Sequence, residues 1–532
     1  MPAIVTDQFR ILNAGNFVDS ITDDANSYYV FVGLSNATST GQYKKSNWDD
    51  ATPNPVDNFD YHGFISDNMS YGKRITSANV KRLAKRYNWT RGAKYEMYRH
   101  DYSVDNKTSS GLNRLYDSKY YVMNSDYKVY ICVDNGTTGL STTPNASLDE
   151  PNFTDLEPSK AGSGGDGYVW KYLFTVTPSD IIKFDSTDYI SLPSNWSSST
   201  DAQVTAVRNN GDSSVNDNQI KKVFIKNRGD GYSTGSHELN ILGDGSGGKV
   251  VVDVDTNGYV TNTVVSAGGK GYSFGVVDTG SIRGAGAGTV EADLVPIIPP
   301  SKGHGFDIYK ELGADKVLVY ARFDDSTKDF PTDTKFAQVG IIKNPTVGGT
   351  GGTVATVFQG PEFSSLDAMI FNDEPNSNDV TKKVDGTPEV GEVIEQKIDT
   401  AGNIARAYVA SFDKETKVLK FFRDRSLNFK GSQNHTDYVG ISTQGKFWDF
   451  KSDGPVVEGK SSGFKGYINN SYTGITTNPS GTKQINLGSA FTSGLSKAEI
   501  NKGSGEMVYV DNRPLIARNT RQKEDVKIIL EF

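Results

Sequence analysis

Short apolar and aromatic runs alternate with polar turns along most of the chain. Residues 28–32 and 127–133 are two such runs, and each is flanked by loops rich in Asn, Asp, Ser and Thr. Apolar runs of this length between turn residues are typical of buried β-strands. Near the C-terminus, apolar side chains occupy every second position from Val526 to Phe532, which predicts a last strand that buries Phe532. The pattern predicts a mainly β protein with a few short helices, with α+β as the alternative class.

One stretch departs from this pattern. Between residues 76 and 87, apolar side chains recur at helical spacing behind the candidate N-caps Thr76 and Ser77, which predicts an amphipathic helix. Its solvated face would carry four basic residues and is a candidate interface: Lys81, Arg82, Lys85 and Arg86. Residues 73–99 hold nine basic residues and one acid, with aromatic residues between them. This stretch is interpreted first as a solvated structural face, then as an interface with an acidic subunit, and last as a nucleic-acid surface.

The segment 207–298 is rich in glycine, valine and aspartate and repeats itself. The sequence Gly-Asp-Gly-Tyr-Ser at 229–233 returns as Gly-Lys-Gly-Tyr-Ser at 269–273, and the glycine cluster at 243–247 is echoed at 284–288. Each copy reads as strand, Gly-Tyr turn, strand, Gly-rich turn and strand. A unit this short would bury its apolar face against its twin. The segment is therefore predicted to be a two-repeat β domain.

Composition limits the class of protein. A chain of 532 residues is expected to form about two to four cores. The net charge of −8 gives no nucleic-acid signal, and the single cysteine, Cys132, excludes an intramolecular disulfide and a thiolate zinc cluster. The sequence has neither a long apolar segment nor the pattern of a signal peptide. We therefore expect assembly in the cytoplasm, without a membrane or nucleic-acid partner.

Three stretches imitate known binding motifs. Residues 454–461 fit the phosphate-loop pattern, but residues 462–467 are a poor helix start, which favours a chance match. Residues 253–258 imitate the first half of a calcium loop, but Val264 stands where a bidentate Glu is needed. The Arg-Gly-Asp at 228–230 is explained by turn chemistry. With widely separated histidines as well, no catalytic, cofactor or metal residue is predicted, although a glycosidase carboxylate pair stays open.

Four separated segments resemble one family of virion proteins. They are Ala3-Ile4-Val5-Thr6 with Phe9-Arg10; Gly165-Asp166-Gly167-Tyr168-Val169-Trp170 with Tyr172-Leu173-Phe174; Ile341-Ile342-Lys343-Asn344-Pro345; and Ser504-Gly505-Glu506-Met507-Val508-Tyr509 with Asn512-Arg513-Pro514. In this order and spacing they are similar to the baseplate wedge protein encoded by gene eight of T-even-type contractile-tailed bacteriophages. The resemblance covers about half of the chain and fades between about 207 and 298 and between about 351 and 485.

The resemblance implies a β-sandwich core, a homodimer and a place in the virion, in the tail baseplate beside other wedge proteins. The core would consist of residues 1–206, 299–350 and 486–532, and the segments 207–298 and 351–485 would be inserted β domains. Such insertions are tolerated because loop-closure entropy grows slowly with length. The alternative function is a receptor- or carbohydrate-binding tail protein, in which the Gly-Tyr repeats would supply aromatic platforms for a host surface glycan.

Overall fold

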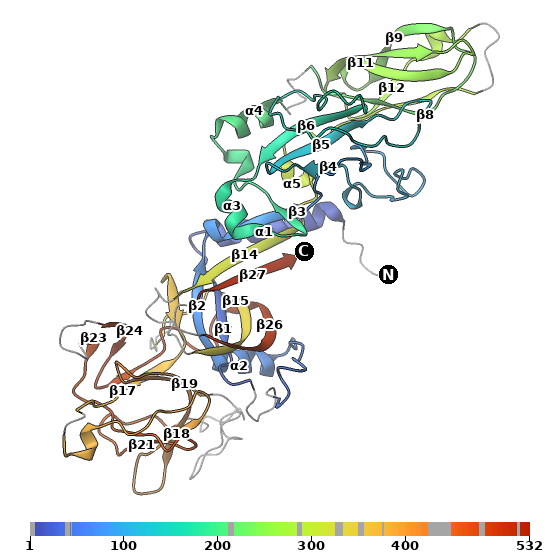
Figure 1. Cartoon of the computed structure of the whole chain (residues 1–532). Coiled ribbons are helices and arrows are strands. Elements are labelled where there is room, and N and C mark those ends of the chain that lie inside the picture. Colours follow the sequence, from blue (N-terminus) through green and yellow to red (C-terminus); the bar gives the residue numbers. More distant parts are fainter. Residues whose placement is uncertain are drawn as a thin grey trace. The chain divides into compact units, whose positions relative to one another are not determined.

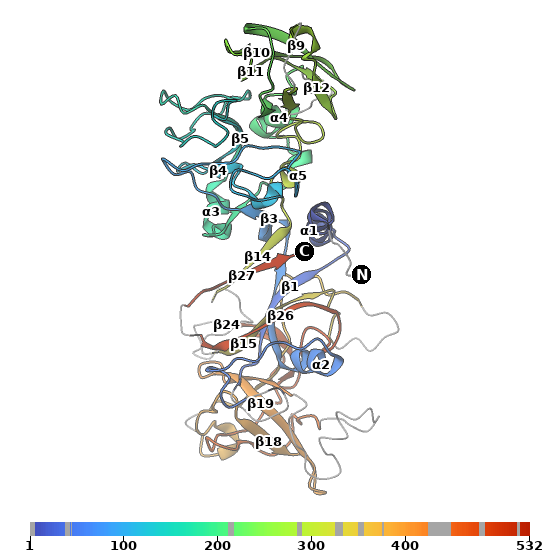
Figure 2. The ribbon, with the colours of Figure 1, turned by 90° about the vertical axis from the view of Figure 1, so that its right-hand side faces the viewer.

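The computed structural model describes residues 6–37, 43, 45–210, 217–284, 290–324, 334–348, 356–374, 377–423, 448–477, 485–518 and 522–532. Strands outnumber helices throughout (Figures 1 and 2), and the predicted mainly β class is confirmed. The chain divides into two compact units. Unit 1 comprises residues 1–18, 81–318 and 529–532, and unit 2 comprises residues 19–80 and 319–528. Because α1, β3, β14 and β27 each contain a boundary, the chain passes from one unit to the other within these elements.

Unit 1 is built on a three-stranded antiparallel sheet of order β4-β5-β6. Its core contains the buried Trp170 and Trp196. The other elements of its main body are short helices and strands around this sheet. Its helices and strands are α1 (Asp7–Thr22), β3 (Val80–Lys85), η2 (Leu115–Asp117), β4 (Tyr121–Met123), β5 (Lys128–Asn135), β6 (Tyr168–Thr175), α3 (Pro178–Phe184), β7 (Tyr189–Ser191), η3 (Trp196–Ser198), α4 (Ala202–Asn210) and α5 (Ile308–Glu311).

The repeated segment forms a β module in which the strands of one copy pair with those of the other. The first copy consists of β8 (Val223–Asn227), β9 (Gly235–Gly243) and β10 (Ser246–Val254), and the second of β11 (Val260–Lys270), β12 (Gly275–Val277), η4 (Gly280–Ile282) and β13 (Asp293–Pro296). β10 pairs with β11, β8 with β13 and β9 with β12, so three ladders join one copy to the other. One apolar core contains residues of both copies. Neither copy could bury its apolar face in this way alone.

Unit 2 contains a five-stranded sheet of order β16-β2-β1-β15-β26. Strands from all three predicted core segments meet in it, because β1, β15 and β26 come from 1–206, 299–350 and 486–532. A strand of the predicted second insert, β16, joins them, and residues 1–206 are shared between both units. The five-segment division and the sandwich arrangement stay predictions. The elements are β1 (Tyr28–Gly33), α2 (Phe59–Asn68), β2 (Met69–Ile75), η1 (Ser77–Asn79), β14 (Lys316–Phe323), β15 (Lys335–Lys343), β16 (Glu362–Ser364), β26 (Glu506–Ala517) and β27 (Glu524–Glu531).

A seven-stranded sheet of order β22-β21-β18-β19-β20-β17-β25 is the second sheet of unit 2. Its core is apolar and includes Val409 and Phe464. A separate two-stranded ladder pairs β23 with β24. The elements are β17 (Asp367–Ile370), η5 (Val380–Lys382), β18 (Val393–Lys397), β19 (Ile404–Asp413), β20 (Val418–Phe422), β21 (Val457–Gly459), β22 (Lys465–Gly466), β23 (Gly474–Thr477), β24 (Ile485–Phe491) and β25 (Leu495–Ser496).

The helix predicted for residues 76–87 is wrong. Of the two predicted caps, Thr76 is an N-cap, and its backbone N–H accordingly donates to the side chain of Asn79 at 3.1 Å. Ser77 is instead the first residue of the turn that follows, which is only three residues long. Strand β3 begins at Val80 and pairs with β7, with Leu83 opposite Ser191. Pairing with a distant strand overrides the helical spacing.

The last strand has the predicted alternation. Val526, Ile528 and Leu530 are more buried than their neighbours along β27. Phe532 is only partly buried, rather than fully as predicted, and its ring centroid lies 5.5 Å from that of Phe17. No helix in the described part of the chain is both long and apolar enough to cross a membrane.

Candidate functional site

Two of the four family-like segments are neighbouring strands. β15 and β26 pair antiparallel, with Ile342 opposite Met507 and Lys343 opposite Glu506. Gly505, just before β26, has a φ of +81°, and a Cβ there would lie 2.8 Å from the carbonyl oxygen of Lys343. Glycine is therefore required both by the left-handed backbone and by the close approach of the chains.

The turn after β15 is tied to both neighbouring segments. Asn344 has a φ of +52°, and its side-chain oxygen accepts from the backbone N–H of Ser27 at 2.7 Å. The hydroxyl of Ser504 accepts from the backbone N–H of Thr346 at 2.9 Å. Pro345, which lies between Asn344 and Thr346 in the chain, is buried. These family-like residues hold the ends of β1, β15 and β26 together.

Asn512 is the centre of a buried polar cluster in the same sheet. Its side-chain oxygen accepts from Gln338 at 2.9 Å, and its amide nitrogen donates to the hydroxyl of Tyr61 at 2.7 Å and to the carbonyl of Pro53 at 2.8 Å. Burial raises the pKa of Tyr61, so its hydroxyl stays protonated. The next residue, Arg513, is held through its carbonyl by the indole of Trp48 at 2.6 Å. Met507 lines a cleft of about 300 Å³ between α2 and β26.

The Gly165–Trp170 segment is also structural. Gly165 and Gly167 have φ values of +66° and +83°. Between them, Asp166 accepts from the backbone N–H groups of Tyr168 and Leu148 at 3.0 and 2.8 Å. The rings of Tyr168 and Trp170 stack with centroids 5.3 Å apart in the core. Of the N-terminal segment, Ala3 to Val5 lie outside the described residues, and Phe9 and Arg10 belong to α1.

The four basic candidate interface residues are all engaged within unit 1. Lys81 pairs with Asp180 at 3.1 Å, Lys85 with Asp117 at 3.6 Å and Arg86 with Asp185 at 2.6 Å; Arg82 donates to the carbonyls of Ile11 and Ala314 and lies over the ring of Tyr309. These contacts support the structural interpretation of the basic stretch. A role in docking another subunit stays a prediction.

The anion-binding part of the phosphate-loop match is filled by the protein itself. The backbone N–H groups of Ser461 and Ser462 donate to the carboxylate of Glu392 at 2.9 and 3.0 Å, and the hydroxyl of Ser462 donates to it at 2.6 Å. Burial alone would raise the pKa of Glu392, but the hydrogen bonds from Ser462 and Ser461 outweigh it and lower this pKa. Lys460 pairs with Glu395 at 3.1 Å. An internal carboxylate therefore occupies the place of a phosphate.

The calcium-loop match is a β-turn, as its sequence predicts. Asp255 accepts from the backbone N–H groups of Tyr259 and Asn257, both at 3.0 Å, and from Arg228 at 2.8 Å. These hydrogen bonds, first of all that from Tyr259, lower its pKa. Among the described residues, no three His, Cys, Asp or Glu side chains form a group that could hold a metal ion.

The repeat tyrosines are anchors of the module. Tyr232 and Tyr272 are each 4% exposed. The hydroxyl of Tyr232 accepts from the backbone N–H of Ala292 at 2.8 Å, and that of Tyr272 accepts from the N–H of Gly248 at 3.0 Å. At this burial, neither Tyr232 nor Tyr272 is a platform for a sugar ring; the carbohydrate-binding alternative itself stays a prediction.

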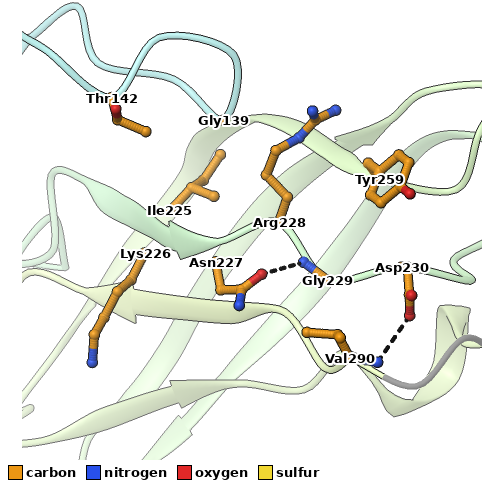
Figure 3. Close-up of a pocket in the computed structure, with 10 residues that line it drawn as sticks. All are labelled: Gly139, Thr142, Ile225, Lys226, Asn227, Arg228, Gly229, Asp230, Tyr259 and Val290. Atoms are coloured by element: carbon orange, nitrogen blue, oxygen red, sulfur yellow. Dashed lines mark hydrogen bonds between the residues drawn. The ribbon is translucent and has the colours of Figure 1, made fainter.

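A cleft of about 520 Å³ lies beside the Arg228–Asp230 turn (Figure 3). It is lined by β8 and the turn after it, by Gly139 and Thr142 from the loop after β5, and by Tyr259. Sequence reasoning interpreted residues 228–230 as a turn only. Thr142 and Tyr259 were missed because no local signal brings residues so far apart in the chain together.

Lys171 is a buried cation of unit 1 whose pKa is shifted. Its ammonium donates to the carbonyl of Leu156 at 2.8 Å and to the side chain of Asn210 at 2.7 Å. Burial, and then the charge of Lys221, lower its pKa to about 8. Between this value and the usual lysine pKa the unfolded chain keeps the proton that the folded chain has released. The contribution of Lys171 to the free energy of unfolding should therefore rise with pH across this window.

Buried tyrosines and Cys132, whose pKa values are raised by burial, oppose this rise in the total free energy of unfolding. The contribution of Lys171 is therefore measured as the difference between the wild type and Lys171→Met in urea denaturation at a series of pH values, and this difference should rise by about 1–3 kcal/mol from pH 8 to pH 10. The difference between the wild type and Lys160→Met, at an exposed position, should stay constant over the same range. The same pH dependence in the wild type and Lys171→Met would contradict this assignment.

The comparisons with known proteins name no family for this chain. No protein-family model matches it, and no curated protein matches it. The resemblance to the baseplate wedge proteins therefore depends on the four sequence segments alone.

Proposed function

We propose that this protein is a non-enzymatic structural subunit of the tail baseplate wedge of a contractile-tailed bacteriophage. In this role it is a homodimer in the virion, is assembled in the host cytoplasm, and holds neighbouring wedge proteins while the baseplate assembles and rearranges on contraction. Such obligate assemblies commonly bury more than about 2,000 Å² in each interface.

One observation carries the proposal. The family-like residues at 341–345 and 504–513 lie side by side in one sheet, although they are far apart in the chain. Their conspicuous polar side chains, Asn344, Ser504 and Asn512, bind other segments of unit 2. If the family shares a structural framework, the residues that carry the resemblance should join distant strands, as these do. If it shared a reaction centre, those residues would line a cavity.

A nonsense mutation in the gene, in a phage that carries it, tests the proposal. We expect filled heads and incomplete tails without a finished baseplate in electron micrographs, and a return of complete particles when the wild-type protein is supplied in trans. Complete contractile particles that fail only to adsorb to cells would contradict the wedge role and support the receptor-binding alternative.

A further inference from the structure

The cleft beside the Arg228–Asp230 turn combines apolar and polar walls. Ile225 of β8 and the ring of Tyr259, which is 40% exposed, supply apolar surface. The exposed Thr142 faces them from another loop (Figure 3). A volume of about 520 Å³ is within the range of small-ligand sites.

Two polar side chains of the cleft are oriented by the backbone and keep hydrogen-bonding capacity. The side-chain oxygen of Asn227 accepts from the N–H of Gly229 at 3.0 Å, and one carboxylate oxygen of Asp230 accepts from the N–H of Val290 at 3.0 Å (Figure 3). In the described part of the chain, neither the amide nitrogen of Asn227 nor the second oxygen of Asp230 has an intramolecular partner. The cleft therefore offers one donor and one acceptor whose side chains are oriented by the backbone.

The charges of the cleft argue against an anionic ligand. Lys226 is paired with Asp293 at 3.2 Å, and Arg228 with Asp255 at 2.8 Å. Among the described residues, Asp230 has no ion-pair partner. The positive charges of Lys226 and Arg228 are therefore already balanced, and the carboxylate of Asp230 would repel a phosphate or carboxylate ligand.

We propose that this cleft binds a neutral saccharide of one or two rings. Sugar hydroxyls both donate and accept, so they satisfy the carboxylate of Asp230 and the amide of Asn227 together. The C–H face of the sugar ring packs on the exposed part of the Tyr259 ring. The Arg228 guanidinium lies 5.1 Å from the centroid of this ring. The same chemistry serves a free sugar and the end of a cell-surface polysaccharide. The site goes beyond the wedge function, which needs no glycan.

The test uses the full-length protein and four neutral disaccharides: maltose, lactose, cellobiose and N,N′-diacetylchitobiose. We expect isothermal titration calorimetry to show millimolar or tighter binding of at least one of them. Tyr259→Ala and Asp230→Ala should each weaken that binding about tenfold or more. Phe274→Ala is the matched control, because Phe274 is a 59% exposed aromatic residue of the same module outside the cleft, and it should leave the affinity unchanged.

The proposal is overturned if none of the four disaccharides binds, or if Tyr259→Ala and Asp230→Ala, folded by circular dichroism, both bind as the wild type does. Displacement of the bound sugar by inorganic phosphate would also overturn it, because an anion site would then be present. Competition with purified surface polysaccharide separates the two sources of the sugar: displacement indicates a polymer end, and its absence a free saccharide.

Discussion

Replacement of Gly269 by alanine is expected to destabilise the two-repeat module by about 4 kcal/mol or more. Gly269 has a φ of +59°, and a Cβ there would lie 2.5 Å from the backbone nitrogen of Gly248 and 2.7 Å from the ring of Tyr272. The added methyl group would push Tyr272 away from β10, in which the N–H of Gly248 donates to the Tyr272 hydroxyl. Hydrogen–deuterium exchange of the full-length protein should show faster exchange throughout residues 218–284.

Gly271→Ala is the matched control for this substitution. Its φ is +75°, but the nearest atom to a Cβ would be 3.9 Å away, so only the left-handed strain of about 1–2 kcal/mol is expected. If both variants exchange alike, the close packing of the Gly-Tyr turn is not what stabilises the module.

Replacement of Asn512 by leucine is expected to lower the free energy of unfolding of unit 2 by about 3 kcal/mol. Leucine has a similar size, but it would leave the buried Gln338 amide and Tyr61 hydroxyl without their shared partner. Chemical denaturation measures the loss. Arg513→Ala, at the next position and with an exposed side-chain ion pair to Asp511, should cost less than about 1 kcal/mol. Equal losses in the two variants would show that the Asn512 cluster has no special role.

The strand pattern and the repeat were readable from the sequence because both depend on local signals. The Gly-Tyr turns are the clearest case: Gly229 and Gly269 both have a φ of +59°, and Gly231 and Gly271 both have +75°, so the repeated letters correspond to a repeated backbone. The sequence did not predict which strands of the two copies pair with each other, because pairing partners are set by the packing of distant segments.

The predicted helix failed for the same reason. The cap at Thr76 was a correct local signal. The spacing of Val80, Leu83 and Ala84 is helical, but the pairing of this segment with the distant strand β7 overrides it. In the candidate sites, Glu392 fills the phosphate-loop match from a segment outside the motif. A motif search finds the loop that supplies the backbone N–H donors, but it does not find the Glu392 carboxylate that already accepts their hydrogen bonds.

Cryo-electron microscopy of purified virions from a phage that carries this gene tests the central claim most directly. The wedge assignment predicts density for this chain in the baseplate, repeated with the symmetry of the tail, with neighbouring baseplate proteins bound to it. Absence of the chain from the virion, or its location only at a fibre tip, would contradict the assignment.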